Sequence, residues 1–90
     1  MKLKYDFAIN QVADKMVAVP IGNALESFSG FIKMNDVGAQ IFEILKNDVT
    51  PEQVIELMLE KHPEATRQEA EQTITEFIAK LKDAGVLTNE

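Results

Sequence analysis

Residues 31–45, FIKMNDVGAQIFEIL, change their hydrophobic period partway through and so decide the expected fold. Side chains alternate up to Met34, as in a β-strand, and apolar residues then recur three and four apart, as in an α-helix. Asn35 stands at the junction, where its short polar side chain suits a helix N-cap. The stretch therefore predicts a strand that passes directly into a helix.

Two more strands are expected before this one. Tyr5, Phe7 and Ile9 alternate on one face, and a short apolar run further along ends at Pro20, which cannot donate to a sheet. The three predicted strands span residues 4–10, 15–20 and 28–34. Paired in chain order, they would form a three-stranded antiparallel meander.

Three helices should follow the strands. Thr50-Pro51 and Thr66 are strong helix starts, and Gly85 is a natural residue just beyond a helix end. The predicted helices span residues 36–46, 51–62 and 67–84. Their expected core residues are Val37, Ile41, Phe42, Ile44 and Leu45, then Val54, Leu57 and Met58, then Ala70, Ile74, Phe77, Ile78 and Leu81. The fold class is therefore α+β, with a winged helix-turn-helix-like order of elements.

Length and composition limit the possible functions. The chain has 90 residues, which predicts one domain over residues 1–90, and it has no cysteine for a disulfide, thiolate nucleophile or thiolate metal site. No apolar run reaches the roughly 20 residues of a membrane span, and charge comes too early for a signal peptide. We expect a cytoplasmic protein with no cofactor, metal or membrane contact.

Charge is distributed unevenly between the two halves. Residues 1–34 sum to +1 and residues 35–90 to −7, within a total of −6. Nucleic-acid binding needs Lys and Arg against phosphates, so the helical half has the wrong sign for it. The third strand, in contrast, should lie at an edge of the meander, where unpaired N–H and C=O groups can accept another strand.

Three segments together resemble PqqD-like proteins. They are Gly30 to Leu45 with its strand–Asn–Gly–helix order, Thr50-Pro51-Glu52-Gln53-Val54, and Phe77 to Leu87. The family often has Trp where this chain has Phe42. The resemblance implies a non-catalytic recognition element that binds the leader of a ribosomally synthesised precursor peptide and presents it to a modifying enzyme, often a radical SAM protein.

The resemblance also implies where the leader binds. It would add as a strand to the third β-strand and lie against the last helix. The residues expected to bind it are Ser29, Gly30, Phe31, Ile32 and Lys33 on the strand and Thr75, Ile78 and Lys82 on the helix. Gly30 would leave room for the added strand, and the opposite helix flank, with Phe77, Thr73 and Lys80, is the competing choice.

Other functions stay open at this point. A winged-helix DNA-binding regulator is the main alternative, although the last helix begins with one basic residue, Arg67. An acyl carrier would need a serine at a helix start, and Ser27 precedes strand-like residues instead. Lone His62 at a helix end suits the helix dipole better than a metal. Cover for the hairpin is an equal alternative for Phe31, and a homodimer that pairs the same strand edges is a further alternative.

Overall fold

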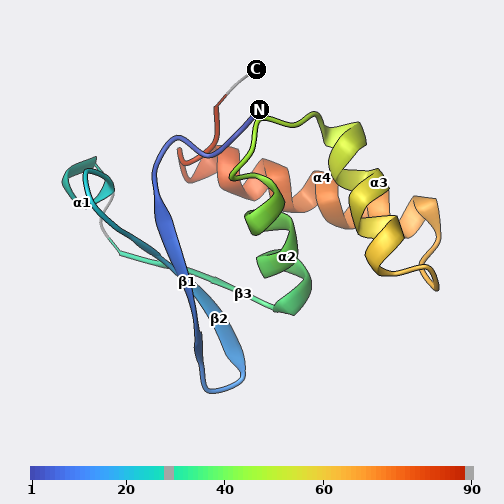
Figure 1. The fold of residues 1–90 in the computed structure, drawn as a ribbon, viewed down its shortest axis with the longest axis horizontal. Helices are drawn as coiled ribbons and strands as arrows, with labels where there is room; N and C mark the ends of the chain where they lie inside the picture. The colour runs from blue at the N-terminus through green and yellow to red at the C-terminus, as the bar shows by residue number, and fades with distance from the viewer. Residues whose placement is uncertain (28–29, 89–90) are drawn as a thin grey trace.

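The fold is an antiparallel sheet packed against a group of helices (Figure 1). A computed structural model describes residues 1–27 and 30–88. The elements in chain order are β1 (Phe7–Val12), β2 (Lys15–Pro20), α1 (Ala24–Ser27), β3 (Ile32–Met34), α2 (Asp36–Ile44), α3 (Pro51–Lys61) and α4 (Arg67–Asp83). This order confirms the predicted α+β class, with the sheet first and the main helices after it.

The sheet has the strand order β1-β2-β3, with antiparallel pairing throughout. A two-residue turn joins β1 to β2, since Val12 pairs with Lys15, and Ala13 adopts φ +57° in that turn. Phe7, Ala18 and Met34 are buried and face the helices. The tip of the β1–β2 hairpin projects away from the helices (Figure 1).

The third strand is shorter than predicted. β3 begins at Ile32 because Gly30 has φ +96°, a conformation that breaks the extended run. Phe28 and Ser29, the first residues of the predicted strand, lie outside the described residues. The short helix α1, which was not predicted, precedes them. Ser27 is its last residue rather than its first, so it does not stand at a helix start.

Local capping sets the starts of the three longer helices, as predicted. The Asn35 side chain accepts the Gly38 N–H at 2.8 Å, and Thr50 and Thr66 each form a capping box. At the end of α4, the N–H groups of Gly85 and Val86 donate to carbonyls of the last turn, which is a Schellman motif. Within residues 1–27 and 30–88, none of the helices combines the length and apolar content that crossing a membrane requires.

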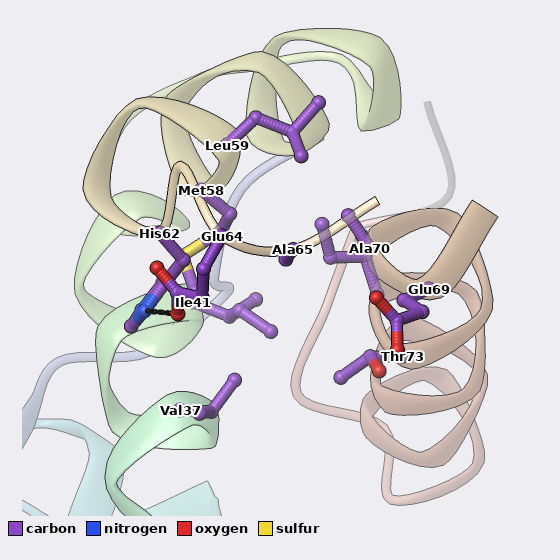
Figure 2. A pocket seen from close by; sticks show the side chains of 11 residues that line it. Val37, Ile41, Met58, Leu59, His62, Glu64, Ala65, Glu69, Ala70 and Thr73 are labelled. Carbon is purple, nitrogen blue, oxygen red and sulfur yellow. Dashed lines mark ion pairs between the residues drawn. The ribbon is translucent and has the colours of Figure 1, made fainter. Parts of the chain in front are cut away.

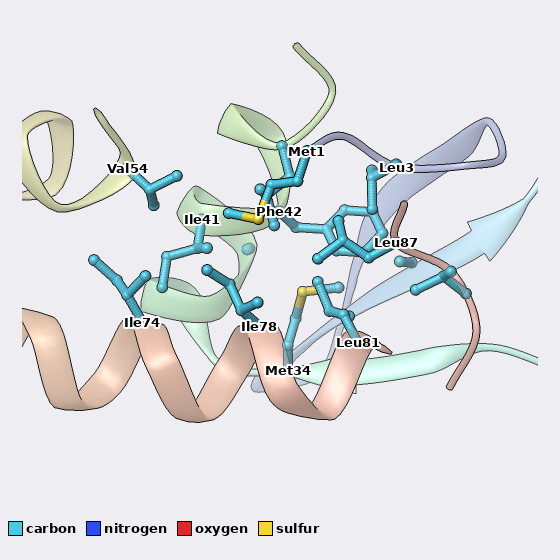
Figure 3. Packing of buried hydrophobic residues seen from close by; sticks show 14 of the residues in the cluster. Met1, Leu3, Met34, Ile41, Phe42, Val54, Ile74, Ile78, Leu81 and Leu87 are labelled. Carbon is cyan, nitrogen blue, oxygen red and sulfur yellow. The ribbon is translucent and has the colours of Figure 1, made fainter. Parts of the chain in front are cut away.

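The core lies between the inner face of the sheet and α2, α3 and α4 (Figure 3). Phe42 is fully buried, and its ring meets that of Phe7 edge-on with centroids 5.3 Å apart. The prediction for α3 was wrong at Leu57, which is 39% exposed. Ile55 is buried instead. The face of α3 that packs against the rest of the protein therefore contains Val54, Ile55 and Met58.

The first residues of the chain do not join the sheet, which corrects the predicted start of the first strand. The Leu3 N–H donates to the Leu45 carbonyl at 2.9 Å, and the Lys4 N–H donates to the Val86 carbonyl at 2.8 Å. Leu3 and Leu87 also form an isolated antiparallel bridge. Residues 1–4 therefore lie between the end of α2 and the segment that follows α4.

Candidate functional site

In the described part of the chain, one side of β3 carries no strand. Ala18 and Met16 of β2 pair with Ile32 and Met34 on the other side, so β3 is an edge of the sheet. Across residues 1–27 and 30–88, no strand or isolated bridge pairs with the outer side of β3. Among the described residues, the backbone groups on this side therefore have no strand partner, which is the feature that an added strand requires.

A hollow of about 440 Å³ lies between β3 and the C-terminal part of α4. Phe31, Ile32 and Lys33 form one wall, and Lys80, Leu81 and Ala84 form the other. The strand edge thus faces a groove whose far wall is a helix. A segment that paired with β3 would find apolar and cationic side chains on both sides.

Phe31 lies at the border between this groove and the outer face of the sheet. Its side chain is 56% exposed, and the Lys33 ammonium lies 5.8 Å from its ring centroid, within cation–π range. Phe31 also lines a second hollow, over the outer face of the hairpin, together with Val17 and Val19. This position allows both earlier interpretations of Phe31, contact with a ligand and cover for the hairpin.

Gly30 has a structural reason in the free protein in addition to the predicted one, which stays a prediction. A Cβ atom on Gly30 would meet no atom of the described residues within 4 Å, so the absence of a side chain relieves no crowding against them in the free protein. Its φ of +96° is the conformation that L side chains rarely adopt. Gly30 therefore permits the bend that leads into β3.

The helix residues predicted for the site do not line the groove. Ile78 is 7% exposed and belongs to the core, while Thr75 and Lys82 are exposed and do not line the hollow beside β3. Lys80, from the competing flank, does line it. Phe77, from the same flank, packs against Gly38. A role in peptide binding stays a prediction for all of these residues, and Ser29 lies outside the described residues.

Sequence reasoning missed two residues of the helix wall. Leu81 was assigned only to the core and Ala84 only to the helix end. Their spacing with Phe77 and Lys80 follows the i, i+3, i+4, i+7 pattern of one helix face, which was the available signal. What the pattern could not give is the direction in which that face points.

A further hollow of about 370 Å³ lies among α2, α3 and α4 (Figure 2). Its apolar lining includes Val37 and Ile41 of α2, Met58 of α3, and Ala70 and Ile74 of α4. Figure 2 shows the labelled side chains of α2 and α4 on opposite sides of this space. No sequence motif had indicated it.

His62 is one of the residues that line this hollow. Its Nε2 atom lies 2.7 Å from Gln40 Oε1 on α2, and its Nδ1 atom lies 3.6 Å from Glu64 Oε2. His62 is the C-cap of α3, as the dipole interpretation of its position requires. In the described part of the chain, no group of three or more His, Asp or Glu side chains is placed to hold a metal ion.

Acidic groups lie along the rim of the same hollow. Glu64 and Glu69 line it, and Glu69 also accepts the Thr66 N–H at 2.9 Å. Hydrogen bonds from the Thr66 backbone and hydroxyl lower the pKa of Glu69 below its ordinary value of 4.5. This end of α4 is therefore negative, while Lys80 makes the β3 end positive.

The start of α4 is poorly suited to DNA. Arg67, its one basic residue there, forms ion pairs with Glu52 of α3 and Glu71 of its own helix. A phosphate would have to compete with both carboxylates for this guanidinium. The surface that a helix-turn-helix protein would place in the major groove is thus neutralised.

The fold and the site together define a small α+β domain with an open strand edge beside a helix. The chain belongs to the family Coenzyme PQQ synthesis protein D (PqqD), whose family model matches residues 15–87. This match confirms the family that the sequence resembled. No curated protein matches the chain.

Two solved structures share the fold. The structure of TbiB1 in complex with the TbiA(beta) leader peptide is 17% identical with a TM-score of 0.72, and the match covers 100% of this chain and 98% of that one. The structure of lasso peptide synthetase B1 complexed with the leader peptide is 24% identical with a TM-score of 0.64, and the match covers 94% of this chain and 93% of that one. At these identities the likeness establishes the fold.

Proposed function

We propose that this protein binds the leader of a ribosomally synthesised precursor peptide, which adds as a strand to β3 and lies in the groove against α4. The single observation that carries the proposal is the outer side of β3, which no described strand pairs with and which faces a hollow walled by Lys80, Leu81 and Ala84. Two proteins of the same fold are described in complex with leader peptides, which supports the same ligand class here.

Backbone hydrogen bonds would supply most of the affinity and set the register, as in other cases of strand addition. Side chains of the groove would supply selectivity. Lys33 and Lys80 stand on opposite walls and favour an acidic residue in the paired segment. Each exposed charge contributes little alone, so their effect is on selection and rate of binding more than on affinity.

The bound leader would bring the rest of the precursor to a modifying enzyme, for which a radical SAM protein is our proposal. Tethering raises the local concentration of the segment to be modified without any new contact to it. The chain itself would do no chemistry, and its part is to hold the peptide. Ion pairing of Arg67 leaves the DNA-binding alternative without a supporting surface.

The test is calorimetry with the synthetic leader of a short precursor encoded beside this gene. Lys33→Pro and Phe31→Lys should weaken binding, and Lys80→Glu should weaken it more than Lys82→Glu. The two lysines are a matched pair, because both are exposed on α4 and only Lys80 lines the groove. Ile78→Asp is a poor probe, since Ile78 is buried and its loss would unfold the domain.

Unchanged affinity in Lys33→Pro, Phe31→Lys and Lys80→Glu, with circular dichroism showing a folded chain, would contradict the proposed groove. Sedimentation of the free protein is the accompanying control. A homodimer that pairs two β3 edges would compete with the leader and would dissociate when the leader is added.

A further inference from the structure

One flank of α4 runs past both hollows. Ala70 and Thr73 line the hollow among the helices, and Lys80 and Ala84 line the groove beside β3. Phe77 stands between them at helical spacing on the same flank. A ligand that follows this flank from Ala84 towards Ala70 passes from one hollow to the other.

The opposite wall is continuous as well. It consists of β3, then the Asn35 cap, then the first turn of α2, where Val37 lines the hollow among the helices. Phe77 touches this wall, because its Cε1 atom would lie 3.1 Å from a Cβ atom placed on Gly38. The half-buried Phe77 ring therefore lies between the α4 residues that line one hollow and those that line the other.

The two ends differ in chemistry. Lys33 and Lys80 are the charged groups beside β3, whereas Glu64 and Glu69 are those of the helix hollow. The apolar lining of the helix hollow includes the buried side chains of Ile74 and Met58. An occupant that matches both ends carries a negative charge at one end and an apolar side chain beside a positive charge at the other.

The distance between the ends suits one short peptide. Leu81 and Ile74 are seven positions apart on α4, which is roughly 10 Å at about 1.5 Å per residue. An extended chain covers this distance in about three to four residues at roughly 3.3 Å each. The helix hollow lies beyond the C-terminal end of β3, so it would receive residues N-terminal to the paired segment in antiparallel binding and C-terminal to it in parallel binding.

We infer that the hollow among α2, α3 and α4 is a second subsite for the peptide that pairs with β3. It takes a large apolar side chain, such as Leu, Ile, Met or Phe, next to a Lys or Arg, about three to four residues from the strand-paired segment. This inference rests on the proposed function, because the same peptide has to bind at β3.

The experiment selects a phage-displayed library of random dodecapeptides on the full chain and measures the synthesised winners by calorimetry. The winners should carry an apolar residue beside a basic one at the stated spacing. Replacing that apolar residue by Ser should weaken binding about tenfold or more, the scale expected from one buried aliphatic side chain.

Two alanines of α4 provide a matched pair of variants. Ala70→Trp fills the hollow, and Ala79→Trp places the same side chain on the exposed opposite face. Ala70→Trp should bind the parent peptide about tenfold more weakly and should no longer distinguish it from the Ser peptide. Ala79→Trp should behave as the unchanged chain does. If Ala70→Trp fails to fold, Thr73→Trp at the exposed mouth of the hollow replaces it.

The outcomes separate this inference from the proposed function. One outcome would overturn the second subsite alone. In it, the peptides bind the Lys33→Pro variant more weakly than the unchanged chain but bind the Ala70→Trp and Thr73→Trp variants as tightly as the unchanged chain. The second subsite would also be overturned if replacing the apolar peptide residue by Ser weakens binding equally in the Ala70→Trp variant and in the unchanged chain. Failure to select any peptide sensitive to Lys33→Pro would contradict strand addition itself, and the second subsite with it.

Discussion

Replacing Gly30 by L-alanine and by D-alanine in chemically synthesised protein separates two explanations of this glycine. At φ +96° an L side chain is strained by about 1–2 kcal/mol, and the stiffer unfolded chain of alanine returns about 0.4–1 kcal/mol. The L variant should therefore lose about 1 kcal/mol of unfolding free energy. The D variant avoids the strain and should gain about 0.4–1 kcal/mol.

Urea denaturation followed by circular dichroism measures the difference. For a denaturant slope near 1 kcal/mol per molar, typical of a small domain, the midpoints of the two variants should differ by about 1–2 M. The pair is matched in volume and polarity and differs only in configuration. No atom of the described residues lies within 4 Å of the L methyl position, so no clash adds to the backbone strain of the L variant.

Equal midpoints for the L and D variants would refute the conformational explanation. Leader binding provides the second readout. If Gly30 instead leaves room for an added strand, both methyl groups would weaken binding to a similar degree. If its role is conformational, the D variant should bind as the unchanged chain does.

Three further predictions concern the hairpin, the core and a helix cap. Phe42→Ala should lose about 3–5 kcal/mol of unfolding free energy in urea, because the fully buried ring leaves a cavity beside Phe7; a loss below about 1 kcal/mol would contradict its central place. Ala13→Gly should raise the urea midpoint, since Ala13 has φ +57°, and a lowered midpoint would argue against this turn. The Glu69 carboxylate should stabilise the fold fully above its ordinary pKa of 4.5 and lose this effect as pH falls through its lowered pKa in the folded state. The melting temperature of Glu69→Gln should accordingly fall less steeply than that of the unchanged chain as the pH is lowered. An equal fall in the two proteins would count against the capping role.

Local signals explain why the helices could be predicted from the sequence. Asn35, Thr50 and Thr66 cap the helices that they were expected to cap, because a cap depends on bonds to residues three positions away. Gly85 ends α4 for the same reason. The strand order also followed from chain order, since short connections pair neighbouring strands.

The sequence-based predictions that were wrong concern features that depend on contacts distant in sequence or on single backbone angles. Nothing in the alternation of residues 28–34 shows that Gly30 takes a positive φ, so β3 was predicted too long. The helical period in α3 allows either Leu57 or Ile55 to be buried beside Val54 and Met58. The packing of the folded protein buries Ile55. Periodicity likewise gives the faces of α4, but only the docking of β3 places Lys80 in the groove.

The most direct test of the central claim is nuclear magnetic resonance of the isotope-labelled chain with bound leader peptide. The account predicts cross-strand contacts between peptide protons and residues 31–34, with slower hydrogen exchange at the outward amides of β3. The amides of β1, which forms the other edge of the same sheet, serve as the internal control and should not change. A peptide that binds tightly while its contacts fall on β1, or on neither edge, would contradict the account.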